Sequence, residues 1–308
     1  MMPADAHRTP TPYPIETGPL SGFSFVAEPL DRADALRDDP QALAALWPQA
    51  RVLVIDAEGL CFVDADGNLL APTGEEIGGG PGSAIFLGLR GAVAWFVVSS
   101  DVIALEVPGR MELRQAAFQW AHADSTAFAQ ARALLHWQRS TRHCSVCGGK
   151  LDFHRAGYTG RCSQCRTEHY PRVDPAVIVA VSDGSRLLLG RQAAWPQHRY
   201  SVVAGFVEPG ETLEQTVARE VMEETRVRVR SARYLGAQPW PFPGALMLGF
   251  EADAEADTPT VNGELEHARW FTADEVGASL RGEGTLLLSP ALSIARALIE
   301  HWYRKMTA

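Results

Sequence analysis

Acidic residues that could hold a metal ion recur at short, fixed spacings between residues 205 and 227, in the run GFVEPGETLEQTVAREVMEETRV. Thr212 opens a Thr-x-x-Gln capping box directly after a Pro-Gly turn, which predicts that a helix begins there. At about 100° per residue, Glu220, Glu223 and Glu224 then share one face of that helix. Like charges on one face repel, so the pattern calls for a compensating cation. Hard oxygen ligands suit Mg²⁺ or Mn²⁺ acting on the phosphates of a substrate.

The whole run resembles the Nudix box, in which Gly, Glu, Arg-Glu and Glu-Glu follow one another at set intervals. A solvated acidic helix face is the simpler interpretation of Glu-x-x-Glu-Glu alone, but the full spacing from Gly205 to Glu224 favours the box. One position departs, because Arg226 stands where the family has Gly, a residue suited to a helix end with positive φ. Arg at this position costs on the order of 1 kcal/mol or shifts the helix end. Nudix enzymes hydrolyse a nucleoside diphosphate linked to another group, and the box alone leaves that group open.

Two Cys-x-x-Cys pairs form a second set of residues suited to chemistry. The spacing of Cys144, Cys147, Cys162 and Cys165 predicts a tetrahedral Zn²⁺ held by four thiolates. Four thiolates leave no open coordination position, so this zinc is predicted to be structural. Disulfides are the alternative, which a reducing compartment disfavours. The remaining cysteine, Cys61, stands among apolar neighbours and is predicted to be buried.

Length and composition limit the class of protein. The chain has 308 residues, enough for two domains and a small module. Its net charge of −9 argues against broad electrostatic binding of nucleic acid, while a local basic groove stays possible. No apolar run is long enough to span a membrane, and the N-terminus lacks a signal-peptide pattern, so we expect a cytoplasmic protein. The proline-rich residues 1–20 are predicted to be loosely ordered.

Apolar patterning predicts the elements that position these residues. Short apolar runs broken by turns predict strands over about residues 20–110, and an Ala- and Leu-rich stretch predicts two helices over about 112–139. The glycine-rich residues 78–82 are predicted to be a connection, because no Lys-Ser/Thr follows them. From Pro175 onward, strands precede the box helix, and further strands and a C-terminal helix follow. This pattern indicates an α/β fold.

A proline-rich stretch, residues 237–247, follows the box with the sequence AQPWPFPGALM. Its prolines exclude a regular interior strand or helix, so the stretch predicts a stiff loop. Trp240 and Phe242 would be flat walls for a base or a nicotinamide ring. A rigid loop that packs on the core is the alternative interpretation.

Together the box, the cysteine module and this loop resemble the NADH pyrophosphatase branch of the Nudix family, from roughly Arg114 to the C-terminal helix. The sequence departs from that branch at Ala237, where the family has Ser. The resemblance implies a catalytic Nudix α/β/α sandwich over 171–308, an intervening four-Cys zinc ribbon over 141–170, and an N-terminal mixed α+β, Nudix-like domain over 1–140.

The resemblance also implies an activity. It is hydrolysis of NADH or NAD⁺ to AMP and nicotinamide mononucleotide with Mg²⁺ or Mn²⁺, by a homodimer, and removal of NAD caps from RNA 5′ ends. A Nudix hydrolase for ADP-ribose or a diadenosine polyphosphate is the first alternative, which the departures at Ala237 and Arg226 keep open. A non-catalytic nucleotide- or RNA-binding module is the second. That module predicts a damaged carboxylate set, whereas every box glutamate is present.

Roles for single residues follow by position from the resemblance. The implied ligands of the catalytic ions are Glu220, Glu224, Glu264 and the backbone carbonyl of Ala204. Glu266 competes with Glu264 on spacing alone, and Glu223 is either a further ligand or the base that helps water attack. Glu211 and Arg219 are implied to pair and to brace the loop on the helix.

Substrate contacts are implied in the same way. Phe206 and Tyr170 are expected to stack on rings, Tyr170 across a dimer interface. The other implied contacts are Gln238, Pro239, Trp240, Pro241, Phe242, Pro243, Gly244, Ala245, Ala295 and Arg114. For Arg114 a merely solvated position on a helix is the alternative.

Overall fold

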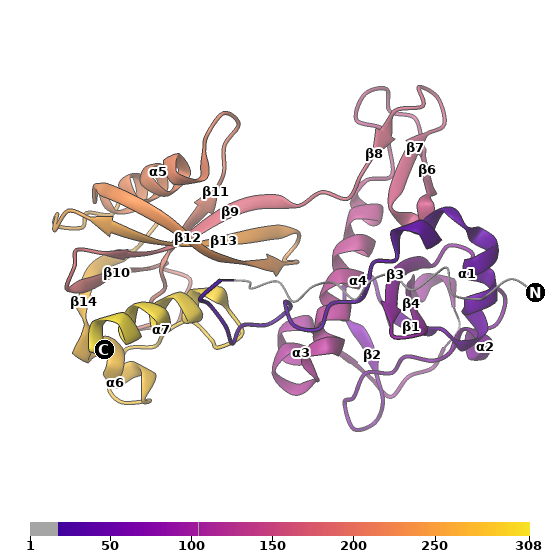
Figure 1. The fold of residues 1–308 in the computed structure, drawn as a ribbon, viewed down its shortest axis with the longest axis horizontal. Helices are drawn as coiled ribbons and strands as arrows, with labels where there is room; N and C mark the ends of the chain where they lie inside the picture. Colours follow the sequence, from indigo (N-terminus) through magenta and orange to yellow (C-terminus); the bar gives the residue numbers. More distant parts are fainter. Residues whose placement is uncertain (1–17, 104) are drawn as a thin grey trace, which may run out of the picture. The chain divides into compact units, whose positions relative to one another are not determined.

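Figure 1 shows the computed structural model, which describes residues 18–103 and 105–308. The prediction of a loosely ordered stretch at residues 1–20 falls almost wholly outside the described residues. The chain divides into two compact units, one of Glu28–Arg172 and one of Val173–Ala308 together with Gly18–Ala27. Residues 18–27 therefore belong with the C-terminal unit, whereas the sequence-based division places them in the N-terminal domain. Among the described residues, no helix has the length and apolar character to cross a membrane.

The first unit is built on a five-stranded sheet in the order β3-β4-β1-β2-β5. Its strands are β1 (Arg51–Ile55), β2 (Cys61–Val63), β3 (Ile85–Arg90), β4 (Val93–Ser99) and β5 (Gly109–Met111). Its helices are η1 (Asp34–Asp38), α1 (Pro40–Leu46), η2 (Trp47–Gln49), α2 (Gly74–Ile77), η3 (Ser100–Val102), α3 (Leu113–Gln119) and α4 (His122–Ser140). The two helices expected over 112–139 are present as α3 and α4, while the apolar pattern did not reveal α1 and α2. Cys61 is fully buried, as expected, and burial raises the pKa of its thiol.

A small three-stranded sheet in the order β6-β7-β8 completes this unit. Its elements are β6 (Leu151–His154), η4 (Arg155–Gly157), β7 (Thr159–Cys162) and β8 (Glu168–His169). Cys162 is the last residue of β7, and the other three paired cysteines lie in the turns and connections beside this sheet. We call residues 141–170 the cysteine ribbon.

The second unit contains a mixed sheet in the order β12-β13-β9-β10-β14, with β11 paired to β9. Its strands are β9 (Asp174–Ser182), β10 (Arg186–Arg191), β11 (Val203–Phe206), β12 (Val229–Trp240), β13 (Ala245–Ala254) and β14 (His267–Thr272). Its helices are α5 (Leu213–Thr225), α6 (Ala273–Leu280) and α7 (Ile294–Thr307).

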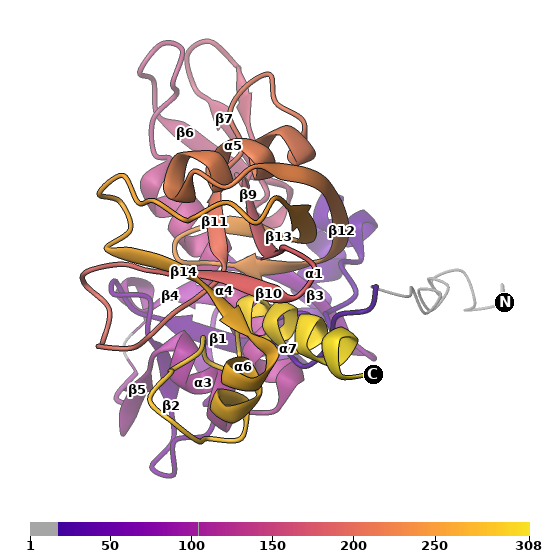
Figure 2. The ribbon, with the colours of Figure 1, turned by 90° about the vertical axis from the view of Figure 1, so that its left-hand side faces the viewer.

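Alternating side chains of β9 place this sheet between two helical layers. Val177 and Val179 pack with Val217 of α5 in one core cluster. Ile178 packs with Leu298 of α7 in a second cluster. Successive residues of a strand face opposite sides, so α5 covers one face and α7 the other, as Figures 1 and 2 show. The α/β/α sandwich expected for the C-terminal part is confirmed.

The segment of residues 18–27, here called the N-terminal segment, packs on this second unit. Leu20 and Phe23 are buried in the same cluster as α7. The backbone N–H of Ser24 donates to the carbonyl oxygen of Leu292 at 3.0 Å. The segment is thus part of the catalytic fold although the whole first unit separates the two in sequence.

Candidate active site

Helix α5 begins where the sequence predicts, and its end decides between the two alternatives left open at Arg226. The Thr212 backbone N–H donates to Gln215 Oε1 at 2.8 Å, and the Gln215 N–H donates to Thr212 Oγ1 at 3.3 Å, so the capping box is formed. At the other end Arg226 adopts φ 60° and ψ 17°, and its N–H donates to the Met222 carbonyl. Arg226 therefore takes the left-handed conformation for which the family has Gly, at a cost on the order of 1 kcal/mol, and the helix does not shift.

Gly205 allows strand β11 to lie directly against the carboxylates of α5. A Cβ atom at this position would lie 1.8 Å from Cδ of Glu220, closer than any real contact. Ala204, the residue before it, pairs with Ile178 of the central strand β9. The box glycine is thus needed for a close approach of strand and helix, and it brings the Ala204 backbone beside the acidic stripe.

Arg219 ties the loop after β11 to helix α5. Its guanidinium contacts Glu211 through two nitrogens, Nε at 2.6 Å and Nη2 at 3.0 Å. Nη2 also donates to the Phe206 carbonyl at 2.8 Å, and Nη1 donates to Glu220 and Glu223 at 2.9 and 3.0 Å. The Arg219 hydrogen bonds lower the pKa of Glu211 to about 2. The pair expected from the sequence is present, and it holds the loop in one position on the helix.

Glu224 is the most unusual carboxylate of the stripe. Its side chain is buried, with the residue 5% exposed, and it forms no hydrogen bond or ion pair with any residue that the structure describes. Burial, followed by the charges of Glu264, Glu220 and Glu223, raises the pKa of Glu224 to about 8. Burial also raises the pKa of Glu220, against the effect of Arg219. A buried carboxylate without a partner is unfavourable unless a cation compensates it.

The two candidate metal ligands that follow β13, Glu264 and Glu266, lie in different surroundings. Glu266 forms an ion pair with Arg191, and its backbone N–H donates to the Arg191 carbonyl. The charge of Glu264 instead raises the pKa values of both Glu220 and Glu224. Glu264 therefore faces the acidic stripe, whereas Glu266 is occupied elsewhere.

These carboxylates fit a divalent ion in chemistry and charge. They are hard oxygen ligands, and one is buried without a partner. Their oxygens do not form a compact ligand cluster in the part of the chain that the structure describes, where only the four cysteines do so.

The proline-rich stretch is partly strand, which differs from the loop expected. Strand β12 continues through Trp240 and pairs with β13 at Gln238↔Met247, Pro239↔Leu246 and Trp240↔Ala245. Because β12 is an edge strand, Pro239 can lack an N–H without breaking a ladder on both sides. The loop is thus reduced to the turn over residues 241–244, which carries Phe242.

The side chain of Gln238 supports this turn through buried hydrogen bonds. The residue is fully buried, and its amide nitrogen donates to the carbonyls of Ser24 at 3.0 Å and Leu292 at 2.8 Å. Its Oε1 accepts from the Ile294 N–H at 2.8 Å. Ala295, also an implied substrate contact, is buried in the core on α7. The side chains of both residues are committed to packing, so their implied contact with the substrate stays a prediction that concerns their backbone groups.

The N-terminal segment adds a ring that the sequence did not reveal. Phe25 is buried, with ring centroids 6.3 Å from Trp240 and 6.4 Å from Phe242, and the latter two rings lie 5.0 Å apart. The available signal was the cluster of apolar residues Leu20, Phe23 and Phe25 directly after the proline-rich stretch of residues 1–20. Three rings from two distant parts of the chain thus form one cluster.

The remaining implied contacts lie in different surroundings. Phe206 is 60% exposed at the end of β11, so its ring is free to stack on a ligand. Tyr170 is 58% exposed and belongs to the first unit, where its hydroxyl donates to Glu168 at 2.6 Å. Arg114 also belongs to the first unit, on α3, and lies 3.6 Å from Glu112.

The four cysteines come together as their spacing predicts. The Sγ atoms of Cys144, Cys147, Cys162 and Cys165 all lie within 4.8 Å of one another, and none is in a disulfide. The backbone N–H groups of Val146 and Gln164 donate to Cys144 and Cys162, each at 3.4 Å. Hydrogen bonds from Thr167 lower the pKa of Cys165 to about 6. Four converging sulfurs fit a tetrahedral zinc ion.

Comparison with known proteins matches both units to family models. The model described as NUDIX domain matches residues 172–287, and the model described as NADH pyrophosphatase-like rudimentary NUDIX domain matches residues 42–137. NAD-capped RNA hydrolase NudC from Mycobacterium bovis (strain BCG / Pasteur 1173P2) is 40% identical over 288 residues, covering 88% of this chain and 92% of that protein. NAD-capped RNA hydrolase NUDT12 from Homo sapiens is 38% identical over 240 residues, covering 70% of this chain and 51% of that protein. A solved NUDIX hydrolase from Nitrosomonas europaea is 24% identical with a TM-score of 0.40, covering 48% of this chain and 97% of that one.

Proposed function

The chain belongs to the NudC-like NADH pyrophosphatase family of Nudix hydrolases, and on this basis we propose that it hydrolyses the diphosphate of NADH or NAD⁺. The products are AMP and nicotinamide mononucleotide. Water forms a new bond to one phosphorus while the bond from that phosphorus to the bridging oxygen breaks.

We extend the proposal to RNA that carries NAD at its 5′ end. The relatives from Mycobacterium bovis and Homo sapiens are both named NAD-capped RNA hydrolases. The bond to be cut is the same diphosphate, so no further catalytic group is required. Removal of the cap leaves a 5′-monophosphate on the RNA.

The observation that carries the proposal is the buried Glu224 carboxylate. It faces three other glutamates, and the pKa of about 8 expresses how unfavourable its charge is without a cation. A structural role would be better served by an apolar or amide side chain. A buried ionisable group with a strongly shifted pKa is characteristic of a functional site.

We assign the divalent ions to Glu220, Glu224, Glu264 and the Ala204 carbonyl. Bound there, Mg²⁺ or Mn²⁺ would offset the charge of the diphosphate and lower the pKa of an attacking water. The protein supplies the geometry. Arg219 holds the loop after β11 against α5 through Glu211 and the Phe206 carbonyl, so the ligands on the strand and on the helix keep their spacing.

Glu223 has two possible roles in this arrangement. Its side chain is half exposed and accepts a hydrogen bond from Arg219 at 3.0 Å. From this position it would either complete the ligand set or accept the proton that the attacking water loses. A base must lie within hydrogen-bond reach of the water, which the exposed rim of the stripe allows.

The aromatic residues would hold the two ends of the dinucleotide. Phe206 offers an exposed ring next to the catalytic strand, and the Trp240–Phe242 pair offers a second apolar wall. The turn over residues 241–244 supplies backbone groups beside these rings. Stacking on an aromatic face is worth roughly 1–3 kcal/mol per base.

Zinc, assembly and location complete the proposal. We assign one structural Zn²⁺ to the four cysteines, and we retain the division into residues 1–140, 141–170 and 171–308 as N-terminal domain, zinc ribbon and catalytic domain. We further propose a homodimer, and a cytoplasmic location, since none of the five cysteines forms a disulfide, which suits a reducing compartment. Elemental analysis and light scattering test zinc content and oligomeric state.

Product analysis of the purified chain tests the function directly. NADH, NAD⁺, ADP-ribose, a diadenosine polyphosphate and NAD-capped RNA are each incubated with Mg²⁺ or Mn²⁺, and the products are separated by chromatography. AMP and the nicotinamide mononucleotide from NADH, and a 5′-monophosphate from the capped RNA, are the expected products. Faster turnover of ADP-ribose or the diadenosine substrate would replace the proposal with another Nudix activity. Binding without turnover of any substrate would support a non-catalytic module.

A further inference from the structure

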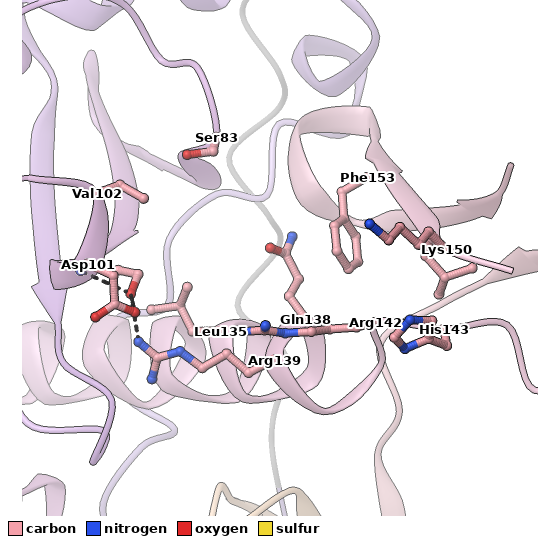
Figure 3. A pocket seen from close by; sticks show the side chains of 12 residues that line it. Ser83, Asp101, Val102, Leu135, Gln138, Arg139, Arg142, His143, Lys150 and Phe153 are labelled. Carbon is pink, nitrogen blue, oxygen red and sulfur yellow. Dashed lines mark hydrogen bonds between the residues drawn. The ribbon is translucent and has the colours of Figure 1, made fainter. Parts of the chain in front are cut away.

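A cavity of about 520 Å³ lies in the first unit, between the C-terminal end of α4, strand β6 of the cysteine ribbon and the end of β4. None of its lining residues belongs to the site described above. In Figure 3, Gln138 on α4 and Phe153 on β6 point toward one another across this space. The volume lies within the range of small-molecule sites.

Two unpaired cations set the charge of the cavity. Arg142 and Lys150 both line it with exposed side chains, and neither forms an ion pair with any residue in the described ranges. Arg139 also lines the cavity, but it donates to the Asp56 carbonyl at 2.6 Å and to Ser99 at 2.9 Å. These hydrogen bonds hold its guanidinium in the wall of the cavity. Asp101 also lines the cavity and accepts a hydrogen bond from Ser99, so three cations outnumber one carboxylate there. This local excess of positive charge reverses the charge that prevails in a chain of net charge −9.

The other lining side chains suit a flat ring. Leu135 and Leu151 are buried and form an apolar floor. Phe153 is half-buried, and its ring is held edge-on against Trp137 with centroids 5.4 Å apart. A fixed aromatic ring beside two cations is the combination that binds a base and its phosphate.

A second cavity indicates an elongated ligand. It has a volume of about 740 Å³ and shares Ser83, Gln138, Leu151 and Phe153 with the first. The two cavities therefore meet at the Phe153 ring and continue along β6. A groove of this length accommodates more than one nucleotide, whereas a free mononucleotide would fill only one part.

We propose that this groove binds single-stranded RNA, with phosphates on Arg142 and Lys150 and a base on Phe153. The inference rests on the proposed function, since it gives the body of a capped RNA substrate a binding surface of its own. It also explains how an acidic protein can hold RNA, because the attraction is confined to one groove.

Binding of a short 5′-phosphorylated RNA oligonucleotide to the zinc-loaded full chain tests this proposal. Lys150→Glu and Arg142→Glu are each expected to weaken binding about tenfold, and Lys150→Gln to reduce the slope of log K against log salt by about 0.7. Arg304→Glu is the matched control, because Arg304 is exposed on α7, has no ion-pair partner among the described residues, and gives the same change of charge. It should leave RNA affinity unchanged within about twofold.

Further arms make the outcome decisive. Phe153→Leu keeps the apolar packing but removes the ring, and should weaken RNA binding. NADH turnover should stay at the wild-type rate in all these variants, and zinc content and circular dichroism verify folding. Unchanged RNA affinity in folded Lys150→Glu and Arg142→Glu would overturn the proposal, as would an equal loss of affinity for AMP, which would indicate a mononucleotide site. Since RNA binding is measured without turnover, an inactive wild-type enzyme would refute the proposed function alone.

Discussion

The two units share one sheet plan. In the first, the order is β3-β4-β1-β2-β5, and in the second β12-β13-β9-β10-β14. In both, the second and third strands of the row are parallel, and all other neighbours are antiparallel. Taken along the chain, β1 corresponds to β9, β2 to β10, β3 to β12, β4 to β13 and β5 to β14. A long helix follows each sheet, α4 in one unit and α7 in the other.

The two units differ in the segment that connects the second and third of the corresponding strands in chain order, β2 to β3 in the first unit and β10 to β12 in the second. The first unit has the four-residue helix α2 there, and the second has strand β11 and the thirteen-residue helix α5. Glu76 on α2 is used in a capping box with Thr73, so no acidic stripe forms. The sheet is therefore a scaffold common to both units, and the acidic stripe of Glu220, Glu223 and Glu224 belongs to the segment that only the second unit has. The description of residues 42–137 as a rudimentary Nudix domain agrees with this comparison.

Removal of zinc should affect only the first unit and has the largest expected effect. Thiolate-bound zinc contributes on the order of 10 kcal/mol to the folding of small modules. Cys162→Ser, at a fully buried cysteine, should therefore unfold the ribbon. Cys61→Ser is the control for loss of a buried thiol outside the cluster. Hydrogen exchange should show lost protection over residues 141–170 and retained protection in β9 and β13. Wild-type zinc content of zero, or uniform loss of protection, would contradict this assignment.

Glu224→Gln should separate catalysis from stability in the second unit. Loss of a charged ligand at a phosphoryl-transfer centre should lower turnover of NADH at least ~10²-fold at saturating Mg²⁺. The same change relieves a buried, unpartnered charge, so the melting temperature should rise by a few degrees. Glu214→Gln, on the exposed first turn of the same helix, should change neither quantity. Near-normal turnover of Glu224→Gln would remove this helix as the distinguishing feature of the two units.

Trp240→Ala should distinguish a substrate wall from simple packing. Loss of one stacking face should raise the KM for NADH about ten- to a hundredfold. A minimal pyrophosphate substrate without bases should be affected far less. Phe25→Ala removes the ring behind this wall from the N-terminal segment, so it should raise the same KM by a smaller factor. Equal losses on both substrates, with unchanged circular dichroism, would assign Trp240 to packing.

Arg226→Gly should produce the smallest effect, a gain in stability. Gly adopts the left-handed conformation of Arg226 without steric cost, so the unfolding free energy should increase by about 1 kcal/mol, roughly 2–4 °C in melting temperature. Arg226→Ala removes the charge but keeps the unfavourable φ, and it should give no such gain. An equal gain from both variants would show that the charge of Arg226, and not its backbone, is responsible.

Features encoded by local spacing could be predicted from the sequence. Each of these features depends on residues that lie close to one another in sequence: the capping box at Thr212, the acidic face of α5 and the cysteine cluster. The different surroundings of Glu264 and Glu266 could not be predicted in this way, because they depend on Arg191 in another strand. The strand character of Pro239 depends on β12 being the sheet edge, which no local pattern reveals.

The role of Gln238 was also beyond local patterning. Its three hydrogen bonds reach Ser24, Leu292 and Ile294, which only the folded chain brings together. A motif comparison assigns the residue to the substrate because it stands inside a signature loop. Its buried side chain also supports that loop, a role that the motif alone does not indicate.

The N-terminal segment also determines when the enzyme can be completed during synthesis. The hydrogen bonds of Ser24 can form only after Gln238, 214 positions later, and Leu292 have been synthesised. Residues 28–172, by contrast, need no partner from the second unit to form their sheet. At about 5–20 residues per second, a ribosome needs roughly 6–24 s to pass from Arg172 to Leu292. During that interval Leu20, Phe23 and Phe25 lack the second unit on which they pack, so their apolar side chains stay exposed. Exposed apolar side chains of this kind are a target for a chaperone.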